Sequence, residues 1–233
     1  MRRDALRRAG VLLAAGVLLL AVVVLIGLLL THVLVHGPVG HLDDAIERSL
    51  ARSRTGLGNS LTFAGTQLAE PLNVEVALAV LVLLLAAVTR TVRPALFLAV
   101  TVIGESAIYF IASSTVPRDR PHVPRLGMGD PIASYPSGHA AASVCLYGAL
   151  TVLAWRLTFA RALQVGLTVV AVVVPPLVGF CRMYRGFHHL SDIVVGLLLG
   201  VAWLAVTTRV LLPATTRKAE HRDRPRCESD QDL

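Results

Sequence analysis

The chain has 233 residues, of which 55% are hydrophobic and only 16% are charged. Soluble domains carry about 25% charged residues, so this composition excludes an ordinary soluble protein and indicates that much of the chain faces lipid. A net charge of +7 can indicate a nucleic-acid partner. Here the arginines stand mostly at the ends of apolar runs, so the sequence predicts a membrane protein with no nucleic-acid partner.

Six apolar segments follow one another along the chain, and each has the length of about 17 to 25 residues that crosses a bilayer as a helix. They are residues 11–32, 72–89, 95–115, 140–157, 162–181 and 190–212. The predicted fold is therefore an all-α integral membrane protein in which six transmembrane helices form a bundle, with residues 11–212 as its single domain.

The distribution of arginine predicts the topology. Residues 1–10 are basic and precede a run that is too long for a cleaved signal peptide, which indicates a retained anchor. The short connections at 90–94 and 156–161 are also basic, as cytoplasmic loops are. Both termini are therefore expected in the cytoplasm of a plasma-membrane protein, and the polar, aperiodic residues 213–233 are expected to be a disordered cytoplasmic tail.

One stretch outside the spans has helical periodicity. The sequence HLDDAIERSLARSR, residues 41–54, places Leu42, Ile46 and Leu50 at helical spacing among charged residues. This pattern predicts a short amphipathic helix on the outer surface. It fits a helix that lies on lipid and equally a loop helix that packs on the bundle.

Three polar clusters remain once the lipid-facing residues are set aside. They are PRDRP at 117–121, PSGH at 136–139 and CRMYRGFHHLSD at 181–192. The six-span topology places all three on the outer side of the membrane, where they can form a single site.

The PSGH cluster stands immediately before an apolar helix, whose first N–H groups lack internal partners and attract an anion. Ser137 could donate a hydrogen bond to that anion, or it could simply cap the helix. Gly138 lets a ligand approach the backbone closely. His139 stands beside the expected anion and can exchange a proton near neutral pH.

The third cluster contains a histidine and a carboxylate at helical spacing. His188 and Asp192 are four residues apart and so share a helix face. A carboxylate bonded to one imidazole nitrogen raises the basicity of the other, which prepares a nucleophile or a base. Arg182 can reach the same anion, whereas His189 is expected to point elsewhere and Arg185 to meet lipid headgroups.

Arg118 and Arg120 supply further positive charge, and arginine binds phosphate through two parallel hydrogen bonds. The arginines, the helix N-terminus and the two histidines together indicate a phosphate site with an acid and a nucleophile. No carboxylate cluster or Cys/His array in the sequence points to a metal, so no metal and no cofactor is expected.

The motif order resembles that of the type 2 phosphatidic acid phosphatase superfamily, and the six-span layout resembles its membrane branch. The matching residues are Arg120-Pro121, then Pro136 to His139, then Arg182, His188 and Asp192. This resemblance implies that His188 attacks phosphorus to form a phosphohistidine, that Asp192 orients His188, and that His139 protonates the leaving oxygen. It also implies that the phosphoryl oxygens are held by Arg120, Arg182, Ser137 and the Gly138 amide.

Two positions depart from the family's pattern. The first motif usually begins with a lysine at the position of Ser113, and Arg118 could supply the missing charge. The last motif usually opens with a serine at the position of Cys181. Glu105 also stands out in the middle of the third span, where an ionisable group needs a partner. It could orient an arginine of the site or fix the packing of helices.

The expected function is that of a metal-independent membrane lipid phosphatase. Its partners would be membrane lipids and a substrate such as phosphatidic acid, phosphatidylglycerophosphate or an isoprenoid diphosphate, among which the sequence does not choose. The alternative is a non-catalytic lipid-binding or transport protein that retains the fold.

Overall fold

The computed structural model describes residues 2–127, 133–157 and 160–212. The described elements are α1 (Arg2–His32), a 3₁₀ turn η1 (Leu34–His36), α2 (Pro38–Arg52), α3 (Gly56–Gln67), α4 (Pro71–Thr89), α5 (Val92–Thr115), α6 (Gly138–Leu157), α7 (Arg161–Tyr184) and α8 (Leu190–Leu211). Six helical stretches are long and apolar enough to cross a membrane: α1, α3 with α4, and α5 to α8. The predicted all-α, six-span fold is thus confirmed.

The predicted spans agree with the helices to within a few residues at most ends. The largest differences are at the starts of the first two spans: α1 begins at Arg2 instead of residue 11, and the second stretch includes α3 and so begins at Gly56 instead of residue 72. The predicted tail at 213–233 lies outside the described residues.

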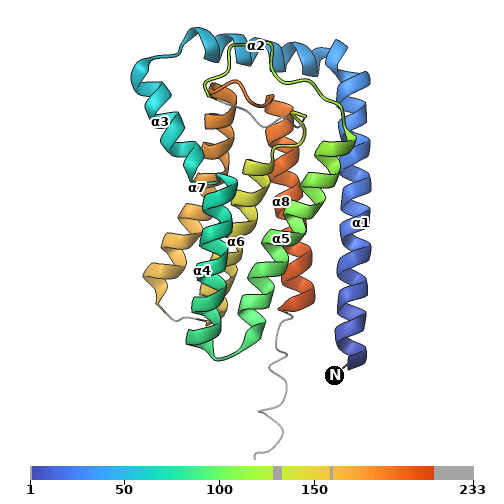
Figure 1. Cartoon of the computed structure of the whole chain (residues 1–233), viewed down its shortest axis with the longest axis vertical. Helices are drawn as coiled ribbons and strands as arrows, with labels where there is room; N and C mark the ends of the chain where they lie inside the picture. The colour runs from blue at the N-terminus through green and yellow to red at the C-terminus, as the bar shows by residue number, and fades with distance from the viewer. Residues whose placement is uncertain (1, 128–132, 158–159, 213–233) are drawn as a thin grey trace, which may run out of the picture.

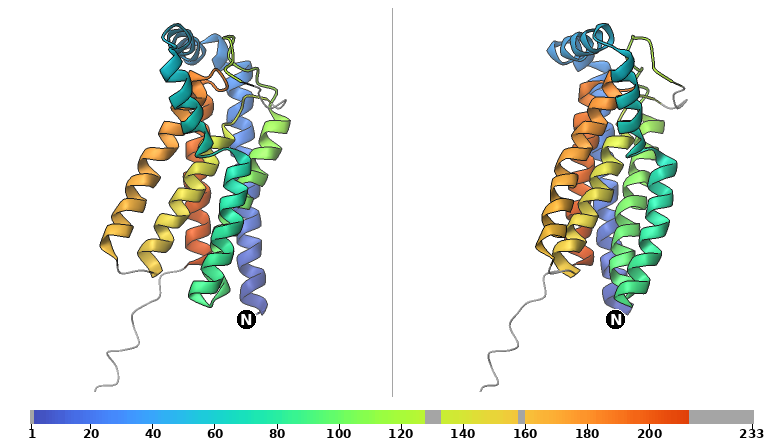
Figure 2. Two further views of the ribbon diagram at one scale, coloured as in Figure 1. Left: turned by 60° about the vertical axis from the view of Figure 1, so that its left-hand side comes forward. Right: turned by 90° about the vertical axis from the view of Figure 1, so that its left-hand side faces the viewer.

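The spans stand side by side, and α2 lies across one end of the bundle (Figures 1 and 2). The start of α1 and the end of α8 both lie at the opposite end (Figure 1). The loops that carry the polar clusters lie near α2, so one end of the bundle is polar and the other holds both described chain ends.

The core of the bundle lies between α5, α6 and α8, where Phe97, Leu98, Cys145 and Leu199 are almost fully buried. Helices in membranes approach closely where residues are small. Gly196 on α8 is such a position, because a Cβ there would lie 2.4 Å from the carbonyl oxygen of Ser137. This close contact fixes the start of α6 against α8.

The helix α2 lies where the amphipathic helix was predicted, but its acids face inward. Asp43 and Glu47 each expose 3% of their surface, whereas Leu42 is 54% exposed. The surface helix therefore packs on the bundle through its carboxylates. Helix α3 was not predicted; its sequence is rich in glycine, and Thr55 caps it by accepting a hydrogen bond from Gly58 N at 3.0 Å.

Candidate functional site

His188 lies in the tight turn between α7 and α8, with 3% of its surface exposed. The turn includes Gly186 at φ 77°, a conformation that favours glycine. Nδ1 of His188 lies 2.7 Å from the carbonyl oxygen of Ser134. Because a carbonyl oxygen only accepts, Nδ1 carries the proton and Nε2 keeps the lone pair.

The surroundings of His188 favour its neutral form. Burial lowers the pKa of His188 well below its ordinary value of 6.5, and the positive charges of Arg182, Arg120 and His139 lower it further. The hydrogen bond to Ser134 offsets only part of this effect. The imidazole is therefore neutral at pH 7, which is the form that a nucleophile requires.

Asp192 holds His188 through an intermediary rather than directly. Its Oδ2 lies 3.9 Å from Nδ1 of His188, beyond hydrogen-bond distance, and it accepts a bond of 2.6 Å from the hydroxyl of Ser134. Ser134 thus connects the two residues. Its hydroxyl donates to the Asp192 carboxylate, and its carbonyl oxygen accepts from Nδ1 of His188. The sequence predicted that His188 and Asp192 share one helix face. This is corrected, because α8 begins only at Leu190 and His188 lies before it.

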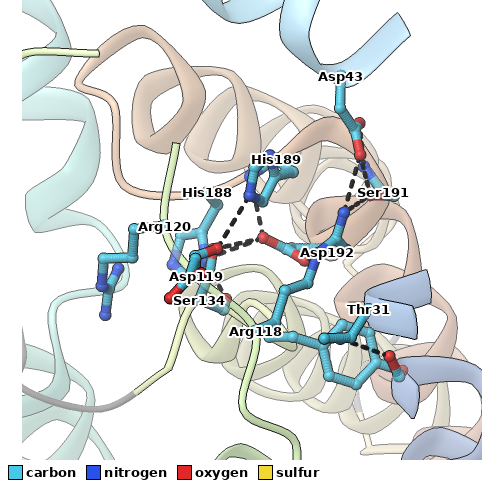
Figure 3. A network of polar contacts seen from close by, with 12 residues as sticks. Thr31, Asp43, Arg118, Asp119, Arg120, Ser134, His188, His189, Ser191 and Asp192 are labelled. Atoms are coloured by element: carbon cyan, nitrogen blue, oxygen red, sulfur yellow. Dashed lines mark hydrogen bonds and ion pairs between the residues drawn. The ribbon is translucent and has the colours of Figure 1, made fainter. Parts of the chain in front are cut away.

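Arg118 also lies beside Asp192, and not in the position that the sequence indicated. Its Nη1 donates to Asp192 Oδ1 at 2.6 Å, and its Nη2 donates to Asp43 Oδ2 and to Ser191 Oγ, both at 2.9 Å (Figure 3). Both terminal nitrogens are thus bound within the protein, and Arg118 is 6% exposed. This geometry favours a structural ion pair over the predicted phosphate contact.

Arg120 and Arg182 gather around Phe187, the residue before His188. The Cζ atoms of Arg120 and Arg182 lie 6.0 Å and 4.2 Å from the centre of the Phe187 ring. Nη1 of Arg120 also donates to the Phe187 carbonyl oxygen at 2.8 Å, and Figure 3 shows Arg120 beside His188. The two arginines therefore concentrate positive charge next to the imidazole.

The PSGH motif forms the N-terminus of α6, as expected. Ser137 is fully buried, and its Oγ lies 3.5 Å from Ala140 N, so its hydroxyl is placed as a long helix cap. Gly138 has a packing reason to lack a side chain, because a Cβ there would lie 2.8 Å from the ring of Tyr109. His139 is 6% exposed and follows directly.

Glu70 is a neighbour of His139 that sequence reasoning missed. Its Oε2 lies 3.2 Å from Nε2 of His139. Glu70 precedes α4 and is followed by Pro71 at the first helical position. The preceding turn is fastened to α6, since the Tyr147 hydroxyl donates to the Leu68 carbonyl oxygen at 2.8 Å.

Two acidic residues of α2 contact residues that border the site, and no pattern in the sequence predicts these contacts. Glu47 pairs with Nδ1 of His189, and Asp43 bonds Ser191 and Arg118. Burial on its own lowers the pKa of His189, but the bond to Glu47 and the charge of Asp192 outweigh burial and raise it. His189 thus faces α2, in agreement with the expectation that it points elsewhere.

The two family departures are visible in the structure. Ser113 is 2% exposed and donates to the Phe110 carbonyl oxygen at 3.1 Å, so it brings no charge to the site. Cys181 is buried as a free thiol in α7. Within residues 2–127, 133–157 and 160–212, no group of three or more His, Cys, Asp or Glu side chains could hold a metal ion.

The fold is that of a multi-pass membrane protein with a polar site at one end of its helix bundle. The sequence matches the PAP2 superfamily over residues 94–215, and the chain belongs to that superfamily. The resemblance drawn from the motifs is thereby confirmed. The crystal structure described as the first transmembrane PAP2 type phosphatidylglycerolphosphate phosphatase from Bacillus subtilis has a similar fold. It has a TM-score of 0.69 and 21% identity, and the match covers 84% of this chain and 92% of that chain. No curated protein matches the sequence.

Proposed function

We propose that the chain is a metal-independent membrane lipid phosphatase that works through a phosphohistidine. The observation that carries this proposal is the contact of Nδ1 of His188 with the Ser134 carbonyl oxygen, which leaves the lone pair on Nε2, within the electrostatic reach of Arg120, Arg182 and His139. A neutral imidazole beside concentrated positive charge can attack a phosphate that the same charge holds.

In the first step, Nε2 of His188 attacks phosphorus, and the bond from phosphorus to the leaving oxygen breaks. His139 gives its proton to that oxygen. In the second step, His139 takes a proton from water, whose oxygen attacks the phosphohistidine and releases inorganic phosphate. The phosphoryl oxygens would be held by Arg120, Arg182, Ser137 and the N–H of Gly138. Asp192, with Arg118 and Ser134, positions His188 without touching substrate.

Amphiphilic phosphates are the proposed substrates, because the site lies at the end of a membrane-spanning bundle (Figure 1). The basic residues Arg90, Arg93, Arg156 and Arg161 lie at the other end of the spans, on the side expected to be cytoplasmic. We place both termini in the cytoplasm and the site at the outer face of the plasma membrane. Phosphatidic acid, phosphatidylglycerophosphate and isoprenoid diphosphates all present a phosphate at such a surface.

The purified full chain should release inorganic phosphate from at least one of these lipids, and EDTA should leave the rate unchanged. The reason is that arginine supplies the positive charge at the site. Phosphate release is measured colorimetrically with and without EDTA. Complete loss of activity that Mg²⁺ restores would contradict the metal-independent mechanism. Tight binding of the lipids without any phosphate release would favour the lipid-binding alternative.

Glu70→Gln should shift the basic limb of the pH–rate profile to lower pH while the acidic limb stays in place. The carboxylate of Glu70 stabilises the protonated His139 that serves as the acid, and the amide does not. The matched control is Glu75→Gln, which removes the same charge from an exposed position on α4. An unchanged basic limb in Glu70→Gln, or an equal shift in both variants, would show that Glu70 does not act through His139.

A further inference from the structure

A groove of about 520 Å³ lies between α4, α5 and α6 and reaches the site at its upper end. Gly138 and His139 line that end. Ile103 and Phe110 also line the groove and are 59% and 58% exposed, so the groove opens on the side of the helix bundle that would face lipid. A lipid chain can therefore enter from the bilayer while its phosphate lies at His139.

Glu105 lines this otherwise mainly apolar groove. It is 1% exposed, and in the described part of the chain neither of its carboxyl oxygens has a hydrogen-bond partner. The hydroxyl of the adjacent Ser106 is near enough to interact with this carboxyl group, but its hydrogen bond goes to the Val102 carbonyl oxygen, at 3.0 Å. Neither of the partners expected for Glu105, an arginine of the site or a bond that fixes helix packing, is found among the described residues.

The protonation of Glu105 follows from these surroundings. An isolated carboxylate charge among apolar groups costs far more than a neutral carboxyl. The neutral form has one O–H that can donate a hydrogen bond, and a buried donor without an acceptor is itself costly. The groove therefore offers a donor that a ligand with an acceptor at the right depth would satisfy.

The depth of Glu105 can be read from its neighbour one helical turn away. The ring of Tyr109 packs against Gly138, so Tyr109 lies level with the start of α6. Glu105 is four residues earlier in α5, about 6 Å further into the membrane. In a diacylglycerol phosphate the ester carbonyls are only a few covalent bonds from phosphorus, whereas a polyprenyl phosphate has only hydrocarbon at that depth.

We propose that Glu105 donates a hydrogen bond to an ester carbonyl of the substrate and so selects diacylglycerol phosphates over polyprenyl phosphates. This inference rests on the proposed phosphatase function and names the substrate class of the same site. Glu105 is then a specificity-determining residue within the groove.

The test compares ester-linked phosphatidic acid with its ether-linked analogue of equal chain length, which lacks the carbonyls. The wild-type protein should have a kcat/KM about 5-fold higher for the ester, as one neutral hydrogen bond allows. Glu105→Met removes the donor at similar size and should bring the ratio close to one. Glu105→Gln keeps an N–H donor and should keep most of the preference. The matched control is Glu75→Met, an exposed acid that lines the same groove and whose replacement should not change the ratio.

Equal rates on ester and ether in the wild-type protein would overturn the proposal, even if the Met variant does not fold. A ratio in Glu105→Met that equals the wild-type ratio would overturn it as well. Nitrophenyl phosphate, which has no lipid chain, serves as the reference substrate to which the lipid rates of each variant are normalised. A wild-type protein that hydrolyses neither this compound nor any lipid phosphate would refute the phosphatase itself rather than the role of Glu105.

Discussion

His188→Ala should abolish phosphate release from a lipid phosphate and from nitrophenyl phosphate alike, lowering kcat by at least about 10⁴-fold. The reason is that Nε2 of His188 forms the new bond to phosphorus in the proposed mechanism, so no leaving group can compensate for its absence. His188 is buried in the turn that contains Gly186, and its Nδ1 is held by the carbonyl oxygen of Ser134. Release of phosphate is measured on both substrates with the same protein preparation.

His139→Ala provides the contrast within the same site. It should lose about 10²- to 10⁴-fold on a lipid phosphate, the usual contribution of an acid that protonates a leaving group. Nitrophenolate needs little protonation, so the loss on nitrophenyl phosphate should be much smaller. If His188→Ala is the variant that recovers on nitrophenyl phosphate, the roles of the two histidines are the reverse of those proposed.

Arg118→Ala should destabilise the protein by about 3–5 kcal/mol, because it leaves buried carboxylates without their cation. The side chains of Asp43 and Asp192, its two partners, are 5% and 0% exposed. Thermal unfolding in detergent measures the effect. The matched control is Arg48→Ala, whose ion pair with Asp44 is about half exposed and is worth about 1 kcal/mol or less.

A second change separates structure from catalysis at Arg118. In Arg118→Ala combined with Asp43→Asn, one of the unpaired charges is gone, so part of the lost stability should return. A single Arg118→Ala variant with wild-type stability and an approximately 10²-fold lower turnover would contradict this account. That result would support the role predicted from sequence, in which Arg118 replaces the cation missing at Ser113.

The spans were predictable from the sequence because a run of about 20 apolar residues is typical of a membrane-spanning helix and rare in soluble proteins. The motif residues were predictable as well. The structure brings His188, Arg120 and Arg182 together, and His139, at the N-terminus of α6, is also close enough to influence His188. In both cases the information lies in a short stretch of chain.

The contacts that hold the site came from residues far apart in the sequence. Glu70 is 69 residues from His139, and Glu47 is 142 residues from His189. Nothing local distinguishes these acids from solvated surface charges. The helical spacing of Leu42, Ile46 and Leu50 predicted α2 but not the burial of its acids, since an acid buried by a distant cation or imidazole leaves no hydropathy signal.

The most direct test of the central claim is to identify the residue that carries phosphate during turnover. Wild-type protein is mixed with radiolabelled substrate, quenched within one turnover under alkaline conditions that preserve phosphohistidine, and mapped by proteolysis and mass spectrometry. The mechanism predicts label on His188, and none in His188→Ala. Label on His139, or a wild-type protein that turns over rapidly yet never carries phosphate on His188, would contradict it.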